Sequence, residues 1–164
     1  MFSNNFICKG SSIILFLALF LYGCAALTVK RDDSMSVREY SYSYDEVWNN
    51  LIEVIVQKGD TITLKNKEKG IILTGYDRMT MQELKRIAKM PPLEISSGLA
   101  GAWLYARDKV DYSVSRTAPR NTHIKMTVYF QCYNASGQRW INIFTNGIKE
   151  KEIFDELELR LGQT

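Results

Sequence analysis

The chain has 164 residues, with 21 lysine or arginine and 18 aspartate or glutamate side chains, so its formal net charge is +3 at pH 7. This near balance, with both signs spread along the chain, excludes the class of nucleic-acid-binding proteins that depend on a clustered cationic face. No internal repeat or low-complexity tract occurs, which excludes repeat architectures.

The N-terminal segment has the pattern of an exported, lipidated protein. A polar stretch with one cation, Lys9, precedes ten strongly apolar residues, 13–22. This length fits the hydrophobic region of a secretory signal peptide and is short for a helix that crosses about 30 Å of hydrocarbon. Residues 21–24 (L-Y-G-C) resemble a bacterial lipobox, although Tyr22 stands where a small residue is more common. The alternative is an uncleaved signal anchor over residues 11–29.

The lipobox interpretation divides the chain into three parts. It predicts a signal peptide over residues 1–23, a lipidated tether over 24–34 and a single α+β domain over 35–164. The lipobox resemblance implies that Cys24 carries a diacylglyceryl group, with no other cofactor, and stable attachment does require more than one acyl chain. It also implies, from Ala25 in place of aspartate after the cysteine, a lipid-anchored envelope protein in the outer membrane, facing the periplasm.

The cysteines do not form a disulfide framework under this interpretation. Cys8 is removed with the signal peptide and Cys24 is acylated, so Cys132 is left alone. Cys132 lies in the apolar row of a predicted strand, where a small buried thiol is common.

The sequence of the first half of the domain predicts a strand, a helix, a hairpin and a short helix. Residues 35–42 alternate imperfectly, as an edge strand does. Ser43 and Glu46 form a capping box and Gly59 fits a helix-closing position, so we predict a helix over 44–58. The other three segments are a hairpin of two strands, 61–65 and 71–76, and a second helix over 80–89 that opens with a capping box of Thr80 and Glu83.

The sequence of the second half of the domain predicts three strands and a final helix. Apolar and polar side chains alternate over 103–115 and 122–132, so each strand has one buried and one solvent-facing side. A small-residue loop, 96–102, precedes them, and a strand over 139–145 and a helix over 147–161 follow. The element order predicts an α+β fold of the helix-grip type: an antiparallel sheet of about five to six strands packed against a long C-terminal helix and an N-terminal helix, with a short inserted helix.

Two local patterns resemble a known family. Residues 44–48 (Y-D-E-V-W) match a "Y-D-x-V-W" helix, and residues 70–74 (G-I-I-L-T) match a "G-x-I-x-T" hairpin that follows it. The closing helix over 147–161 is also similar. The family is that of the BamC (NlpB) type of envelope lipoproteins, accessory proteins of outer-membrane β-barrel assembly. The resemblance implies helix-grip domains, of which this chain has one where BamC has two.

No pattern in the sequence predicts catalysis or a metal site. The one histidine, His123, falls on the solvent-facing side of its strand, with no nucleophile placed near it. Asp32 and Asp33 are the nearest acidic pair, and they lie in the tether. The glycines of the 96–102 loop lack phosphate-loop spacing. We also expect the acidic residues of the last helix to face solvent: Glu150, Glu152, Asp155 and Glu156.

Two surfaces are candidates for binding. The first is the cationic side of the short helix, which could lie against anionic lipid or could simply be solvated: Lys85, Arg86 and Lys89. The second is the solvent-facing side of the long strands: Tyr105, Arg107, Lys109, Lys125 and Tyr129. Tyrosine and arginine are enriched at interface hot spots, but exposed tyrosines are also ordinary on antiparallel sheets.

Three functions are compatible with these patterns. We expect a membrane-anchored, non-catalytic interaction or assembly module, with the membrane and an envelope protein as partners and no nucleic acid. The alternative is a carrier or sensor that holds an apolar ligand between the sheet and the C-terminal helix. An enzyme is the third, for which the sequence offers no active site. Solid packing between the apolar rows of the sheet and of the last helix would argue against a carrier.

Overall fold

The structure is a computed structural model that describes residues 33–89, 103–135 and 138–162. Cys24, the predicted signal peptide, the predicted tether up to residue 32 and the predicted 96–102 loop lie outside the described residues. The described chain has an α+β fold with an eight-stranded antiparallel sheet and three α-helices, the last of them C-terminal. Within this part of the chain, no helix is both long and apolar enough to span a membrane.

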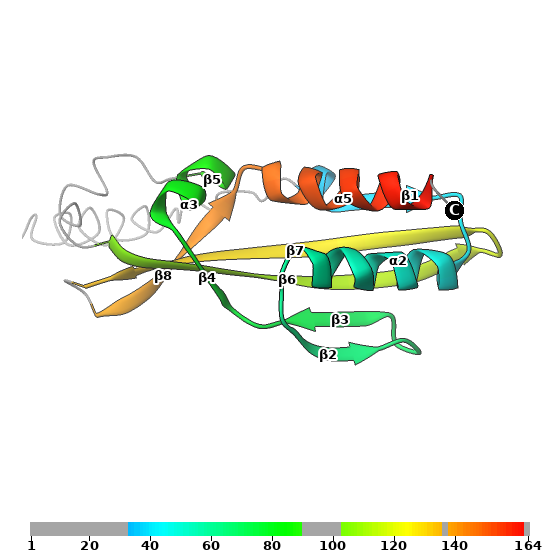
Figure 1. The fold of residues 1–164 in the computed structure, drawn as a ribbon, viewed down its shortest axis with the longest axis horizontal. Coiled ribbons are helices and arrows are strands. Elements are labelled where there is room, and N and C mark those ends of the chain that lie inside the picture. The colour runs from blue at the N-terminus through cyan, green and yellow to red at the C-terminus, as the bar shows by residue number, and fades with distance from the viewer. Residues whose placement is uncertain (1–32, 90–102, 136–137, 163–164) are drawn as a thin grey trace, which may run out of the picture. The chain divides into compact units, whose positions relative to one another are not determined.

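The elements follow one another as a strand, a helix, three strands, a short helix and four more strands before the last helix (Figure 1). Their bounds are η1 (Asp33–Ser36), β1 (Val37–Tyr40), α2 (Tyr44–Gln57), β2 (Ile62–Asn66), β3 (Ile71–Thr74), β4 (Asp77–Met79), α3 (Met81–Ile87), β5 (Ala88–Lys89), β6 (Trp103–Ala118), β7 (Asn121–Asn134), β8 (Arg139–Thr145) and α5 (Ile148–Leu161).

The long hairpin of β6 and β7 is the centre of the sheet. Two short strands share the far edge of β7, since β8 pairs along its C-terminal half and β1 along its N-terminal half. The far edge of β6 is shared in the same way by β3 and β4. The main path through the sheet is β2-β3-β6-β7-β8-β5.

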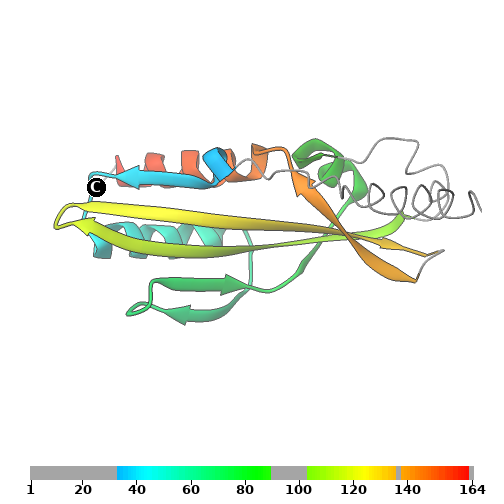
Figure 2. The ribbon, with the colours of Figure 1, turned by 180° about the vertical axis from the view of Figure 1, so that it is seen from behind.

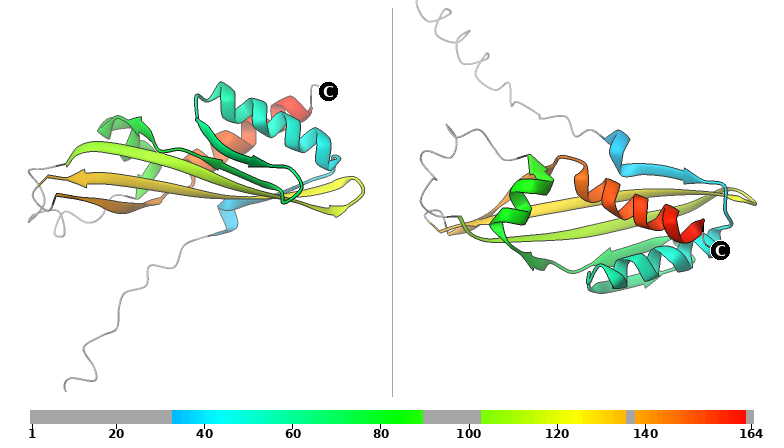
Figure 3. Two further views of the ribbon diagram at one scale, coloured as in Figure 1. Left: turned by 90° about the horizontal axis from the view of Figure 1, so that it is seen from below. Right: turned by 45° about the horizontal axis from the view of Figure 1, so that its top comes forward.

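Both long helices lie on one face of this sheet, which we call the inner face (Figures 1 and 3). Figure 2 shows the opposite face, which neither α2 nor α5 covers and which we call the outer face. The predicted alternation is confirmed, because the inner rows of β6 and β7 are each 5% exposed or less: Ala106, Val110, Tyr112, Val114, Ile124, Met126, Val128, Phe130 and Cys132.

The helix α2 begins where the capping box predicted. The Ser43 hydroxyl accepts a hydrogen bond from the backbone N–H of Glu46, and the Glu46 carboxylate accepts one from the backbone N–H of Ser43. The helix ends at Gln57, one residue earlier than predicted, and Gly59 follows with a positive φ of 84°. Its buried side contains the predicted stripe: Val47, Leu51, Val54 and Ile55.

The predicted strand count of five to six is wrong for the described chain, because two very short strands that were not predicted, β4 and β5, raise it to eight. The second helix also ends earlier than predicted, at Ile87. Residues 88 and 89 leave it to pair with Thr145 and Phe144 of β8. At its start, the Thr80 hydroxyl accepts from the backbone N–H of Glu83, which is half of the predicted capping box.

Candidate functional site

The outer face carries an exposed group of aromatic and cationic side chains where β4, β6, β7 and β8 meet. The register places Tyr105 opposite Tyr133, Arg107 opposite Gln131, and Lys109 opposite Tyr129. Because side chains of a strand alternate between faces, the partners in β8 on this side are Trp140, Asn142 and Phe144. We define the outer-face cluster as Tyr76, Arg78, Tyr105, Arg107, Lys109, Tyr129, Tyr133, Trp140 and Phe144.

Arg107 is the centre of this cluster and is held rigidly. Its guanidinium carbon lies 4.1 Å from the ring centroid of Tyr76 and 3.8 Å from that of Trp140. Its Nε donates a 2.9 Å hydrogen bond to Gln131, whose amide nitrogen in turn donates to Asn142 at 2.8 Å. These contacts fix the plane of the guanidinium, and no described residue accepts a hydrogen bond from its two terminal nitrogens.

Lys109 continues the cluster along β6. Its ammonium nitrogen lies 4.6 Å from the ring centroid of Tyr129 and 5.7 Å from that of Tyr76. It also lies 2.9 Å from the Asp111 carboxylate, and this hydrogen bond raises the pKa of Lys109. The rings touch one another as well, because Tyr133 meets Trp140 edge-on at 5.4 Å between centroids.

Arg78 joins the cluster through a strand that the sequence did not predict. In the pairing of β4 with β6, Arg78 is directly opposite Arg107, so both side chains project from the same face. Arg78 is exposed, and no described carboxylate forms an ion pair with either arginine. Like charges directly opposite each other in a sheet are destabilising, so this pair is not explained by stability.

The structure brings four of the five residues predicted for this surface together: Tyr105, Arg107, Lys109 and Tyr129. Lys125 lies on the same face but farther along β7, opposite Ser113 and Val37. Sequence reasoning missed Arg78 and the aromatic residues that flank Arg107. The alternation over 139–145 could have placed Trp140 and Phe144 on one side of β8, but only the register shows that this side is the outer face.

The three predicted cations of the short helix do not form one surface. Arg86 is paired with Glu152 of α5 on the inner side. Lys85 is exposed on α3, and Lys89 lies in β5 opposite Phe144, at the margin of the outer-face cluster. The predicted cationic patch is therefore divided between two faces.

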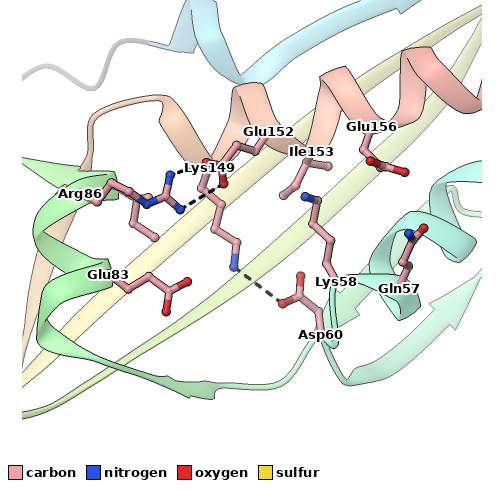
Figure 4. A pocket seen from close by; sticks show the side chains of 10 residues that line it. Gln57, Lys58, Asp60, Glu83, Arg86, Lys149, Glu152, Ile153 and Glu156 are labelled. Atoms are coloured by element: carbon pink, nitrogen blue, oxygen red, sulfur yellow. Dashed lines mark hydrogen bonds and ion pairs between the residues drawn. The ribbon is translucent and has the colours of Figure 1, made fainter.

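A polar cleft of about 370 Å³ lies on the inner side, between α2, α3 and α5 (Figure 4). Lys149 points into it, bonds to Asp108 of β6 and lies 3.7 Å from Asp60. Burial lowers the pKa of Lys149, but the two carboxylates outweigh it and the net pKa is raised. Burial also raises the pKa of Asp60, more than Lys149 lowers it. These charges pair with one another and tie α5 to the sheet.

One acidic residue of α5 corrects the prediction that all of them face solvent. Glu150 is 0% exposed and accepts a 2.6 Å hydrogen bond from the Thr145 hydroxyl. Glu152 and Glu156 are partly exposed and Asp155 is exposed. The helix turns Glu150 inward because its first turn begins directly at the end of β8.

The other residues considered for chemistry are in ordinary environments. Cys132 is 0% exposed, and burial raises the pKa of its thiol to about 11, so it is a neutral thiol at physiological pH. His123 is half-buried on the outer side of β7. Within residues 33–89, 103–135 and 138–162, no three side chains of the metal-binding types lie close enough to hold an ion.

The apolar side chains of the sheet and of α5 pack against one another. Ile153, Phe154 and Leu157 are each 1% exposed or less and belong to one core cluster with the inner rows of β6 and β7. The Arg38 guanidinium also lies against Phe154, 5.1 Å from its ring centroid.

Comparisons with known proteins add a distant structural similarity. No protein-family model matches the chain, and no curated protein matches it. The crystal structure of a DUF4468 family protein from Bacteroides ovatus matches with a TM-score of 0.39 and 11% sequence identity, covering 77% of this chain and 84% of that one. A similarity at this level supports no inference about function.

Proposed function

We propose that the chain is a membrane-anchored, non-catalytic lipoprotein of the bacterial cell envelope that works as an interaction module. The observation that supports this function is the outer-face cluster. Tyr105, Tyr129 and Trp140 are 55%, 38% and 37% exposed, and these residue types and arginine are enriched at binding hot spots. The lipobox at Cys24 supports the anchor, and an envelope protein is the partner that the sequence leads us to expect.

We also infer that the domain is of the helix-grip type, with α5 as the long helix held against the sheet. The contacts of Ile153, Phe154 and Leu157 with the inner rows support this assignment. The relation to BamC-type lipoproteins depends on the sequence patterns of α2, the β2–β3 hairpin and α5. A role in β-barrel assembly has no observation in its favour.

The carrier alternative has no observation in its favour either. A ligand between the sheet and α5 would require space among side chains that are instead buried against one another. The cleft beside Lys149 is lined mainly by charged groups, which do not suit an apolar ligand.

Site-specific photocrosslinking in whole envelopes tests the interaction surface. A photoreactive phenylalanine analogue replaces Tyr129 in one variant and Leu159, which is 58% exposed on α5, in a control variant. We expect crosslinked products, with an envelope protein or with lipid, from position 129 well above those from position 159. Equal yields at the two positions would contradict the proposed surface.

The anchor is tested separately by Cys24→Ser. This change removes the thiol that accepts the lipid, so we expect loss of metabolic fatty-acid labelling and accumulation of the uncleaved form. Normal labelling and cleavage of the variant would show that Cys24 is not the lipidated residue. A wild-type protein that starts at Met1 and has the mass of its unmodified residues would overturn the anchor itself.

A further inference from the structure

We propose that the outer-face cluster lies on the phospholipid bilayer and that Arg78 and Arg107 bind lipid phosphate groups there. This inference rests on the proposed lipid anchor at Cys24, and it assigns lipid, in place of an envelope protein, as the component that this surface contacts. Four observations support it: the arginine pair, the cations beside the rings, the length of the tether and the charge of the face.

The arginine pair has the chemistry of an anion site. Arg78 and Arg107 face each other across β4 and β6 without a described carboxylate partner. Contacts with Tyr76, Trp140 and Gln131 hold the Arg107 guanidinium in one plane, so its terminal N–H groups are available in a fixed direction. A planar guanidinium binds the oxygens of a phosphate by two parallel hydrogen bonds. An anion between the two arginines would also remove their mutual repulsion.

Three rings of the cluster have a cation beside them, which leaves fewer ring faces for stacking. Cations already occupy ring faces, since Arg107 lies over Tyr76 and Trp140, and Lys109 lies over Tyr129. Sugars and nucleobases bind to aromatic residues through free ring faces. Exposed tyrosine and tryptophan beside lysine and arginine are instead the side chains preferred at the headgroup level of a membrane.

The tether brings this surface within reach of the membrane. Nine residues, 24–32, separate the lipidated position from η1, and a fully extended chain of that length spans about 30 Å. The left view of Figure 3 shows η1 at the edge of the sheet, on the side away from α2. Val37 pairs with Lys125, which lies six residues along β7 from Gln131, the partner of Arg107. That separation is about 20 Å at about 3.3 Å per residue, within the span of the tether.

The charge of the face is complementary to phosphate. Three lysines add positive charge to the arginine pair: Lys109 at the centre of the cluster, Lys125 farther along β7 and Lys89 in β5. Two carboxylates of the described residues also face this side: Asp111, bonded to Lys109, and Glu39, bonded to Thr117 toward the β6–β7 turn. An anionic bilayer surface therefore meets a net positive, partly aromatic face.

The test uses the full lipidated chain reconstituted into vesicles of phosphatidylcholine and phosphatidylglycerol. A fluorophore is attached to Tyr105→Cys at the rim of the cluster, or to Leu159→Cys on α5, two positions that are 55% and 58% exposed in the native chain. The native Cys132 is buried and does not compete for the label. With a quencher carried on the lipids, we expect strong quenching at position 105 and little at position 159.

The arginine pair is then removed by Arg78→Gln together with Arg107→Gln. A cation near an anionic surface strengthens binding about fivefold, so the double change should lower the docking equilibrium about 25-fold. The matched control, Lys58→Gln with Lys65→Gln, removes the same charge from two positions outside the cluster and should leave quenching at position 105 unchanged.

Three outcomes would overturn the inference. They are equal quenching at positions 105 and 159, quenching that survives loss of both arginines, and crosslinking of position 129 in whole envelopes to a protein instead of lipid. Flotation separates these results from failure of the anchor. A chain that does not float with the vesicles contradicts the lipid anchor itself, whereas a chain that floats with equal quenching contradicts only the docking.

Discussion

Lys149 and Asp108 are charged residues that are buried between α5 and the sheet. Their side chains are 15% and 6% exposed, and Asp60 beside them is 12% exposed. Asp108 interrupts the apolar row of β6, which has no explanation within the strand itself. Its explanation is the ammonium group of α5, because a buried charge costs several kcal/mol unless a partner compensates it. The pair therefore fixes the first turn of α5 against β6.

We predict that Lys149→Met lowers the free energy of unfolding by about 3–5 kcal/mol, because it leaves two buried carboxylates without their cation. Adding Asp108→Asn should restore a large part of that loss. Urea unfolding of the single and double variants measures both effects. The matched control is Lys151→Met on the same helix, whose pair with Asp155 is exposed and should contribute no more than about 0.5 kcal/mol. Equal losses for the two lysines would show that the buried pair does not hold α5.

At the scale of elements, two glycines with positive φ, Gly59 and Gly70, lie in different surroundings. Gly70, with a φ of 64°, closes the β2–β3 turn, and a Cβ added there would lie 1.9 Å from the backbone oxygen of Val114. Gly59, with a φ of 84° after α2, has nothing within 4 Å of such a Cβ. The backbone of the β3 hairpin approaches β6 closely enough at Gly70 that only glycine fits.

This difference predicts unequal effects of the same substitution. Gly59→Ala carries only the cost of a left-handed conformation, about 1 kcal/mol. Gly70→Ala adds a clash with the backbone of β6, and overpacking of that kind raises the total to about 2–4 kcal/mol. Thermal or urea unfolding of the two variants measures the difference. A Gly70→Ala variant as stable as Gly59→Ala would mean that the hairpin can move away from β6 at little cost.

The elements that were predicted correctly have their signals within a few residues of sequence. Ser43 and Glu46 position the start of α2 by themselves, and the alternation of β6 and β7 follows from one buried side per strand. The strands β4 and β5 have three and two residues, too few for a periodic pattern. They exist because β6 and β8 offer them an edge, which depends on residues far away in the chain.

The candidate site divides in the same way. Tyr105, Arg107, Lys109 and Tyr129 were identified because each strand alternates. Arg78 was missed because its position opposite Arg107 depends on the register of a strand without a local signal. Glu150 was assigned to solvent because helical spacing shows which residues share a side but does not show how the connection after β8 orients that side. Sequence patterns thus predicted which residues share one side of a strand or helix. The pairing of strands and the connections between elements decided which of those sides come together.

At the scale of the whole molecule, the two faces of the sheet have separate roles. The helices α2 and α5 cover the inner face, form the core with it and bury the charges of Lys149 and Asp108. Neither α2 nor α5 covers the outer face (Figure 2). Exposed aromatic and cationic side chains lie on this face. The described chain begins at η1, beside β7, so the proposed lipid tether would limit how far the outer face can lie from the membrane.

That limit gives a prediction about the tether, which acts by raising the effective concentration of the outer face at the bilayer. Inserting about 20 flexible glycine and serine residues between Arg31 and Asp32 should lower that concentration about sixfold, since it falls roughly as the −3/2 power of linker length. The docked fraction, read from quenching of the Tyr105→Cys label, should fall accordingly while the protein floats with the vesicles as before. In the Arg78→Gln and Arg107→Gln background the insertion should have little further effect, because little docking is left to lose. Quenching that does not change with the insertion would mean that the tether does not hold the outer face against the lipid.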